Sequence, residues 1–491
     1  MSTDLEGRFR LLARAWRLEA PDAKLPALRH AVIQRLTEAR HEDVWLTLAV
    51  VHGRLPEPDD VIGLARSIER DGAERALRSV TRRARLRGFR EDLEVVEGRI
   101  LLDVHHTAQT ELATGIQRVV RRMVQAGGLA DRDDVMLVGW TSPQFALRAL
   151  TAVERENAVH GGIDVTDVRG PSRVVIPWRS TYVLPELAIE VERTSRLAAL
   201  AEFSGNATGV IGMDCVPVMS GETVGLGMGA AFSRNLCAVA HFDRVAAISE
   251  ASATEYRGWK GMLSGTGLEG PEVRAILIAA EAPGGDASDD ARMRAELAPG
   301  DEPLVLCVGS HEPRKNHGAV LYAAERLWQE GVRFQLAFVG GNSWNSEGFT
   351  LAVERLQRQG RPVISGRGIS DDVLGAAYRH ATAVVFPSLN EGFGLPIVES
   401  IVAGTPVLTS NFGSMAEIGS GNGALLVDPR DDEDVTRGLR DILTDEAVRG
   451  RLLAEIAGYD AKDWATYADE VFGYLAAVDQ RGERRLEYPH G

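Results

Sequence analysis

The chain has 491 residues, a formal net charge of −15 and 44% hydrophobic side chains. This length is too great for one hydrophobic core, so the composition predicts a folded protein with about two or three domains. The negative charge argues against a nucleic-acid-binding protein, because such proteins usually present a basic surface to the phosphates. The cysteines Cys215, Cys237 and Cys307 are widely separated and form no Cys-x-x-Cys pair, which predicts neither a zinc site nor a disulfide framework.

The sequence also bears on the compartment. The N-terminal residues lack the continuous apolar region of a signal peptide. We find no run of about 18 apolar residues that could span a bilayer. These observations predict a cytoplasmic protein in a reducing compartment, and contact with the inner face of a membrane stays open.

Residues 1–97 are predicted to be α-helical, because Leu, Ala, Val and Trp recur at three- and four-residue spacing among charged residues. Within this region, RSVTRRARLRGFR (residues 78–90) contains six arginines and no acid. One interpretation is contact with anionic lipid or a phosphate-bearing acceptor through Arg78, Arg82, Arg83, Arg85, Arg87 and Arg90. The alternative is a solvated helix face whose inward side is formed by Leu77, Val80 and Ala84.

Residues 98–279 alternate short apolar runs with helical or loop stretches, which is typical of a doubly wound α/β domain. RILLDVHH (residues 99–106) is predicted to be a buried strand, followed by a loop at Thr114 and Gly115 and a helix from about Ile116. A strand, a glycine turn and a helix start are a common place to bind a phosphate or a sugar. The later VGLGMGAA lacks the spacing of a dinucleotide-binding loop and is expected only to bend the chain.

Residues 280–303 form the most loop-like passage downstream of the helical region, and we predict a linker there. Residues 304–475 then repeat the alternation of strands and helices, and residues 476–491 are a tail. The fold class predicted from this pattern is α/β, with two Rossmann-like domains that face a cleft behind an α-helical N-terminal region.

Two groups of residues follow predicted strands of the second half, where open α/β sheets bind ligands. The first is VGSHEPRKN (residues 308–316), in which a strand ends at Gly309 and is followed by Arg314 and Lys315. This pair could neutralise a pyrophosphate in a partly desolvated cleft. The alternative is an ordinary solvated pair of basic residues in a loop.

The second group is SLNEGFGLPIVES (residues 388–400). A helix is predicted from about Pro396, and glycines before it would allow close approach of a ligand to the backbone. Glu391 precedes the turn and Glu399 lies one turn inside the helix, so both carboxylates could bind hydroxyls while free amides bind phosphate. That combination suits a sugar nucleotide. The alternative is that both glutamates only solvate or stabilise a helix end.

These stretches, together with SGRGISDDVLGAAYRHATAVVFPS, resemble the retaining glycosyltransferases of family 4, which have the GT-B fold and a Glu-x7-Glu motif. The resemblance covers most of residues 304–475, including a terminal helix that in the family crosses back onto the first domain. A weaker resemblance covers LLDVHHT, TGIQRVVR, MDCVP and DRVAAISEAS, and is to members that build bacterial surface polysaccharides. Residues 1–97 lie outside the resemblance.

The resemblance implies a role for each matching position. It assigns the donor diphosphate to Lys315 with help from Arg314, and the nucleotide ribose to Glu399. Glu391 would lie beside the transferred sugar, and with the two basic residues it forms the expected catalytic group. The remaining expected donor contacts are Gly115, Gly309, Phe393, Gly394 and Leu395.

Two other positions in the motifs bear on these roles. Many relatives have an arginine where this chain has Ser310, which places more of the charge balance on the two basic residues of the loop. Glu417 matches a family position whose role is open.

The implied reaction transfers a hexose, mannose as the first guess, from a nucleotide sugar such as GDP-mannose to a hydroxyl of a glycan or a lipid-linked acceptor. It retains the anomeric configuration and needs no metal or other cofactor. Asp371 and Asp372 are expected to stabilise the start of a helix and not to bind a metal.

Other functions remain alternatives. They are another GT-B enzyme, such as a sugar-nucleotide epimerase or a phosphorylase, and a catalytically silent GT-B subunit that binds a partner through the helical region. The presence of Lys315, Glu391 and Glu399 argues against the silent subunit.

Overall fold

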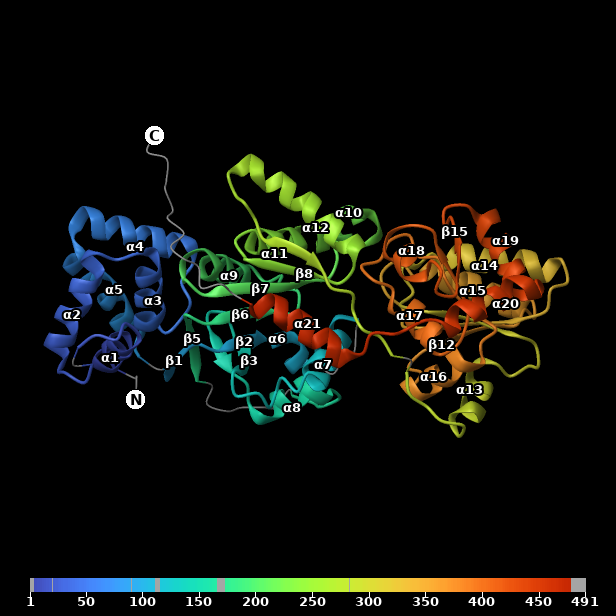
Figure 1. Ribbon diagram of the computed structural model, residues 1–491, viewed down its shortest axis with the longest axis horizontal. Helices are drawn as coiled ribbons and strands as arrows, with labels where there is room; N and C mark the ends of the chain where they lie inside the picture. Colours follow the sequence, from blue (N-terminus) through green and yellow to red (C-terminus); the bar gives the residue numbers. More distant parts are fainter. Residues whose placement is uncertain are drawn as a thin grey trace.

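The computed structural model describes residues 4–19, 21–89, 91–110, 115–165, 173–281 and 283–477. A helical part, a first α/β domain and a second α/β domain follow one another along the long axis of the molecule (Figure 1). The predicted fold class, with two Rossmann-like domains behind a helical N-terminal region, is confirmed. Arg90, Thr114 and the predicted tail from residue 478 onward lie outside the described residues.

The N-terminal part packs around one hydrophobic helix. Its helices are α1 (Leu5–Ala15), α2 (Leu25–Thr37), α3 (His41–His52), α4 (Pro58–Asp71) and α5 (Ala73–Arg87). Helix α3 carries apolar residues on all its sides and is buried from Asp43 to Val51, because a helix without a polar face must be covered by its neighbours. The buried Arg8 of α1 donates hydrogen bonds to the carbonyl oxygens of Val50 (3.2 Å) and Glu91 (2.8 Å).

The end of the helical part needs a correction. The sequence prediction extended this part to residue 97, whereas residues 93–97 form strand β1 (Leu93–Glu97), which pairs in parallel with β5 (Val174–Trp178) at the edge of the first sheet. The run LEVVE is short, and its Leu93 and Val96 are buried in the core. Strand β1 therefore ties the helical part to the first domain through backbone pairing.

Within the described residues, the first domain has a nine-stranded sheet in the order β1-β5-β4-β3-β2-β6-β7-β8-β9. All neighbours pair in parallel except β4, which is antiparallel to β3 and β5. The other strands are β2 (Ile100–Asp103), β3 (Val135–Trp140), β4 (Leu147–Ala149), β6 (Thr181–Leu184), β7 (Ala207–Gly212), β8 (Arg244–Ala247) and β9 (Glu272–Ala275). The helices are α6 (His105–Gln109), α7 (Gly115–Ala126), α8 (Ala152–His160), α9 (Val191–Phe203), α10 (Val216–Met219), α11 (Met228–Val239) and α12 (Glu250–Leu263), with the short 3-10 turns η1 (Gly221–Thr223) and η2 (Ser264–Thr266).

The predicted linker contains a helix. Residues 289–297 form α13 (Asp289–Leu297), which buries Met293 and Leu297 against α16 (Asp371–His380) of the second domain. The Gly- and Asp-rich composition around it suggested a loop, yet these two apolar residues at four-residue spacing are enough to bind the helix to the domain. The covalent connection between the domains is therefore shorter than predicted.

The second domain has a six-stranded parallel sheet in the order β12-β11-β10-β13-β14-β15 among the described residues. Its strands are β10 (Leu304–Val308), β11 (Gln335–Val339), β12 (Val363–Gly366), β13 (Ala383–Phe386), β14 (Val407–Ser410) and β15 (Ala424–Val427). Its other helices are the 3-10 turn η3 (Pro313–Lys315), α14 (His317–Gln329), α15 (Glu347–Arg358), α17 (Leu395–Val402), α18 (Gly413–Gly419), α19 (Asp432–Thr444) and α20 (Glu446–Ala457). The central strands are fully buried, as expected for a parallel sheet covered on both faces.

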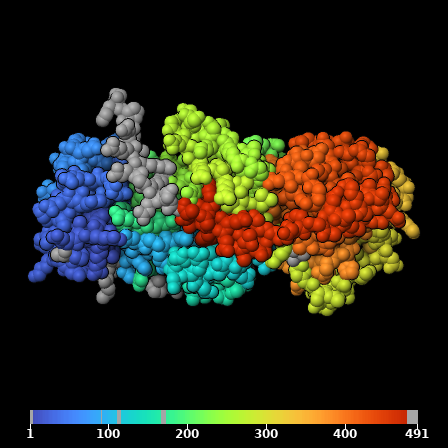
Figure 2. All heavy atoms as spheres, in the orientation of Figure 1, coloured from blue at the N-terminus to red at the C-terminus, as the bar shows by residue number. Residues whose placement is uncertain are grey.

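Helix α21 (Trp464–Ala476) returns from the second domain and lies on the first (Figures 1 and 2). It packs against α7, β7 and β8, and its buried face includes Tyr467, Val471 and Leu475. None of the helices in the described part of the chain is long and apolar enough to cross a bilayer.

Candidate active site

A buried ion cluster stands where β10 and β13, neighbouring parallel strands, reach their carboxyl ends. The loop after β10 carries Arg314 and Lys315 in the turn η3, and the loop after β13 carries Glu391. The Arg314 Nη1 lies 2.6 Å from Glu391 Oε2, and the Lys315 Nζ lies 2.6 Å from Glu391 Oε1. The structure therefore brings together the three residues that the sequence assigned to catalysis.

This cluster is shielded from solvent and close to electrical balance. The side chains of Arg314, Lys315 and Glu391 are only 15%, 11% and 10% exposed, and Arg314 Nη2 also bonds to Glu312 (2.5 Å). Burial alone would raise the pKa of Glu391. The charges of Lys315 and Arg314 outweigh this effect and lower the pKa from 4.5 to about 2. Glu391 is thus a carboxylate at any working pH, and each of its oxygens faces a cation. The Lys315 Nζ also lies 4.8 Å from the centre of the Phe386 ring.

The turn before α17 depends on two glycines. Gly394 has φ 108°, a conformation that favours glycine, and it precedes the first residue of the helix, Leu395, with Pro396 in the first turn. A Cβ at Gly392 would lie 2.7 Å from the Cβ of Asp214 in the first domain. The turn therefore sits directly against the opposite domain, with Phe393 buried beneath it.

Side chains of the first domain bind the backbone of this turn. The hydroxyls of Ser249 and Ser252, at the start of α12, donate hydrogen bonds to the carbonyl oxygen of Gly392 at 2.6 and 3.0 Å. Nearby, Asn390 Nδ2 donates to Ser220 Oγ at 2.9 Å. The loops at the carboxyl ends of both sheets thus meet across the domain interface.

Glu399, the second acid of the motif, lies in a different environment from the first. It is 2% exposed and accepts hydrogen bonds from the Tyr378 hydroxyl (2.8 Å) and from Arg118 Nη2 (2.8 Å). No hydrogen bond or ion pair joins the described side chains of Glu391 and Glu399. Arg118 belongs to α7 of the first domain, one turn after the predicted donor-facing Gly115, which is exposed at the start of that helix.

Glu417 joins the two domains. Its carboxylate accepts the backbone N–H groups of Glu250 (2.9 Å) and Ala251 (3.0 Å), the first residues of α12. A carboxylate at this position satisfies two of the free amides of a helix start and interacts favourably with the helix dipole. The structure therefore gives this residue a role at the interface, which the sequence had left open.

The sequence analysis missed residues that lie near Glu391 and Glu399. Arg118 and Tyr378 were read only as parts of helices, since nothing local marks their contact with Glu399. Asp214 lies two residues after the end of the buried strand β7, a position that could have been recognised. Burial raises the pKa of Asp214, although the charge of Arg314 opposes the shift. The remaining predicted donor contact is Gly309, which directly follows β10. Its φ is 144°, and it lies beside the Lys315 side chain.

These donor roles stay predictions, but the domain that contains the ion cluster matches a known family. Residues 288–463 match the family described as Glycosyl transferases group 1. These residues form a glycosyltransferase group 1 domain. Helix α13 falls inside this match, in agreement with its packing on the second domain.

Two relatives from Escherichia coli are similar to the chain. It is 26% identical to the serotype-specific mannosyltransferase WbdA over 332 residues, which cover 65% of this chain and 38% of WbdA. It is 35% identical to O-antigen chain mannosyltransferase B over 146 residues, which cover 30% of this chain and 38% of that protein. The matched stretches thus span well under half of either relative.

Solved structures share the fold of the glycosyltransferase domain and the domain before it. HepE from Anabaena, in complex with UDP and glucose, has a TM-score of 0.55 at 14% identity and covers 78% of this chain and 100% of its own. Sucrose-phosphate synthase from Thermosynechococcus elongatus has a TM-score of 0.53 at 18% identity and covers 77% of this chain and 98% of its own. The architecture is therefore GT-B.

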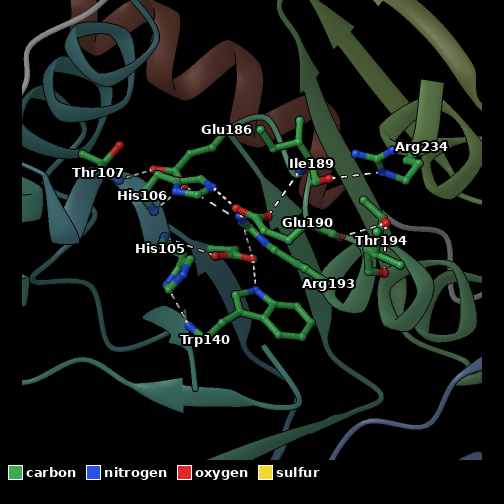
Figure 3. Close-up of polar contacts among 12 residues, drawn as sticks. His105, His106, Thr107, Trp140, Glu186, Ile189, Glu190, Arg193, Thr194 and Arg234 are labelled. Atoms are coloured by element: carbon green, nitrogen blue, oxygen red, sulfur yellow. Dashed lines mark hydrogen bonds and ion pairs between the residues drawn. The ribbon is translucent and has the colours of Figure 1, made fainter. Parts of the chain in front are cut away.

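A second polar cluster occupies the first domain, at the carboxyl ends of the neighbouring strands β2 and β6 (Figure 3). The carboxylate of Glu186 accepts the backbone N–H groups of His106 (2.8 Å) and Thr107 (2.6 Å). The fully buried Arg193 lies 3.0 Å from Asp103, to which Trp140 Nε1 also donates at 2.6 Å. Burial alone would raise the pKa of Asp103, but the charge of Arg193 keeps it below its ordinary value.

The exposed side of this cluster is a pair of titratable groups. His106 Nε2 lies 3.0 Å from Glu190 Oε1, and these side chains are 36% and 24% exposed. Burial lowers the pKa of His106, yet its hydrogen bond to Glu190 and nearby acids raise it above 6.5 overall. Burial raises the pKa of Glu190, and His106 lowers it to about 2. Glu190 is thus a carboxylate at neutral pH, on the same sheet edge that meets the glycosyltransferase domain.

Metal ligation has no preformed group in the described residues, where no cluster of three or more His, Cys, Asp or Glu side chains is arranged to hold an ion. Asp371 and Asp372 lie in the first turn of α16, whose N-cap is Ser370. The three cysteines are free thiols.

Proposed function

We propose that the protein is a retaining glycosyltransferase of family 4 that moves a hexose from a nucleotide sugar to a hydroxyl of a glycan or lipid-linked acceptor. The observation that carries the proposal is the buried cluster of Arg314, Lys315 and Glu391 inside a glycosyltransferase group 1 domain. The names of the relatives, which are mannosyltransferases, favour mannose as the sugar and GDP-mannose as the donor.

In the cluster, a bound diphosphate could replace the carboxylate of Glu391 as the partner of the two cations. A diphosphate entering the cleft would compete with Glu391 for the two cations, because it offers more charge to the same groups. Glu391, released from the cations, would then accept hydroxyls of the sugar beside it. The free amides at the start of α17, next to Gly394, would share the charge of the departing nucleoside diphosphate.

The proposed reaction uses this arrangement. The acceptor hydroxyl enters on the face of the sugar that the diphosphate leaves, which retains the anomeric configuration. Lys315 and Arg314 supply the positive charge that other transferases take from a metal ion, so we propose a metal-independent reaction. Closure of the domains around the donor would exclude water and limit hydrolysis.

We further propose that the protein works in the cytoplasm and contacts the anionic inner face of a membrane through α5. The exposed side of this helix carries arginines and, among them, Leu86, which is 81% exposed. The described arginines of this face are Arg75, Arg78, Arg82, Arg83, Arg85 and Arg87. The only acid on the helix, Glu74, lies at its first turn near Arg29 and Arg78. A basic face with an apolar centre complements an anionic lipid surface.

Vesicle binding tests this contact. Wild-type protein should sediment with phosphatidylserine vesicles and not with phosphatidylcholine vesicles, and added salt should release it. Arg82→Glu with Arg85→Glu should weaken binding by roughly tenfold or more. Arg437→Glu with Arg451→Glu, which changes the net charge equally on the second domain, is the matched control. Equal binding by both variants would contradict the membrane contact.

Donor hydrolysis tests the activity without an acceptor. Purified protein is incubated with GDP-, UDP- and TDP-sugars, with and without EDTA, and nucleotide release is measured. We expect release from one donor that survives EDTA. Lys315→Ala should slow that release by about a hundredfold or more, whereas Lys462→Ala, which breaks the ion pair with Glu470 on the surface, should not. If the wild type releases nucleotide from none of these donors, the result would favour the catalytically silent subunit.

A further inference from the structure

Arg118 is the side chain through which the first domain reaches the buried acid of the glycosyltransferase domain. It projects from α7, at the end of the first domain nearest the second (Figure 1), and donates to Glu399 Oε1 at 2.8 Å. Tyr378, from the second domain itself, donates to Glu399 Oε2 at 2.8 Å. The two oxygens of one carboxylate are thus held by two different domains.

The exposure of these side chains shows which partner can be replaced. Glu399 is 2% exposed, whereas the Arg118 side chain is 32% exposed, so Arg118 is the partner of Glu399 that solvent reaches. Tyr378 is fully buried. A ligand from solvent can therefore reach Arg118 but not Tyr378.

The contact between the domains at this point is a strong one. Burial lowers the pKa of Arg118, but the charges of Glu399 and Asp371 raise it above its ordinary value overall, so the guanidinium stays charged. A hydrogen bond between two charged groups is stronger than one between neutral groups. The ion pair therefore contributes to holding the two domains together.

We propose that Arg118 is a positioning residue that competes with the nucleotide ribose for Glu399 and so links donor binding to domain movement. The inference rests on the proposed function, in which Glu399 accepts the ribose hydroxyls. Because Glu399 is 2% exposed, a ribose hydroxyl reaches Oε1 by displacing Arg118. Donor entry then releases one tie between the domains.

The competition predicts opposite effects for the two partners of Glu399. In Arg118→Met no ion pair must be broken, so a nucleoside diphosphate should bind about tenfold more tightly, equivalent to about 1.4 kcal/mol. In Tyr378→Phe the acid loses its support, so the same ligand should bind more weakly. A merely structural role for Arg118 would weaken binding in both variants.

The experiment is a calorimetric titration of the full chain with GDP, UDP and TDP, followed by steady-state kinetics with the active donor. Arg122→Met is the matched control, because Arg122 lies one turn further along α7 in a half-exposed ion pair with Glu281. Arg118→Met should lower the donor KM, whereas Arg122→Met should not change it. Arg118→Lys, which keeps a charge but loses the forked geometry, should fall between wild type and Arg118→Met.

The outcomes separate the two proposals. Tighter nucleotide binding by Arg118→Met supports the competition, and unchanged or weaker binding overturns it while the wild type still binds. A wild type that binds none of the three nucleotides overturns the proposed function, and the competition with it. Small-angle scattering gives a second readout that does not need the nucleotide: the radius of gyration should be larger for Arg118→Met than for Arg122→Met.

Discussion

Replacing Glu391 by glutamine tests whether the ion cluster is as strongly balanced as its geometry indicates. The fall of the Glu391 pKa from 4.5 to about 2 corresponds to about 3 kcal/mol, at about 1.4 kcal/mol for each pKa unit. Removing one member of a buried ion pair costs about 3–5 kcal/mol, because the partner charges stay buried without compensation. Since the side chain is only 10% exposed, we expect Glu391→Gln to lower the free energy of unfolding by about 3 kcal/mol at neutral pH.

Urea unfolding of wild type and Glu391→Gln, followed over a range of pH, measures this difference. The control is Glu433→Gln, whose carboxylate is 63% exposed beside Arg326 and should cost less than about 1 kcal/mol. A depressed pKa stabilises the fold above pH 4.5, and this contribution disappears as the pH falls from 4.5 towards about 2. The gap between wild type and Glu391→Gln should therefore close in acid. Equal free energies of unfolding for wild type and Glu391→Gln at neutral pH would refute the reasoning.

Two other predictions concern the first domain. Glu417→Ala removes the carboxylate that receives two amides of α12, so the domains should separate more readily and the radius of gyration in solution should increase. An unchanged radius would show that the contact contributes little. The raised pKa of His106 means that its pair with Glu190 stabilises the fold below pH 6.5 and that this contribution is lost as the pH rises through the raised value. The melting temperature of the wild type should therefore fall from about pH 6 to 9 more than that of Glu190→Gln, and parallel curves would contradict the pairing.

The sequence predicted the two Rossmann-like domains because their strands are continuous apolar runs that end in polar residues. It also placed Lys315 and Glu391 at strand ends, and the parallel pairing of β10 with β13 explains why they meet. Helix α13 escaped prediction because its two buried residues stand in a stretch whose composition is typical of a loop. Strand β1 escaped because a five-residue run after several helices carries little signal of its own.

The contact between Arg118 and Glu399 could not be predicted from local pattern. The two residues are 281 positions apart and belong to different domains. In the sequence Arg118 is one of several arginines on a helix, and Glu399 is an acid near a helix start. The packing of one domain against the other brings this arginine to this acid. A single sequence does not show that packing.

The path of the chain limits how the two domains can move. The chain passes from the first domain to the second near residue 281 and returns before α21, which lies on the first domain (Figure 1). A body attached at two short tethers cannot drift away from its neighbour, and its freest motion is rotation about the line that joins the tethers. We therefore expect any opening of the two domains to be a swing about a fixed axis, so that each closure returns the same loops to the same partners.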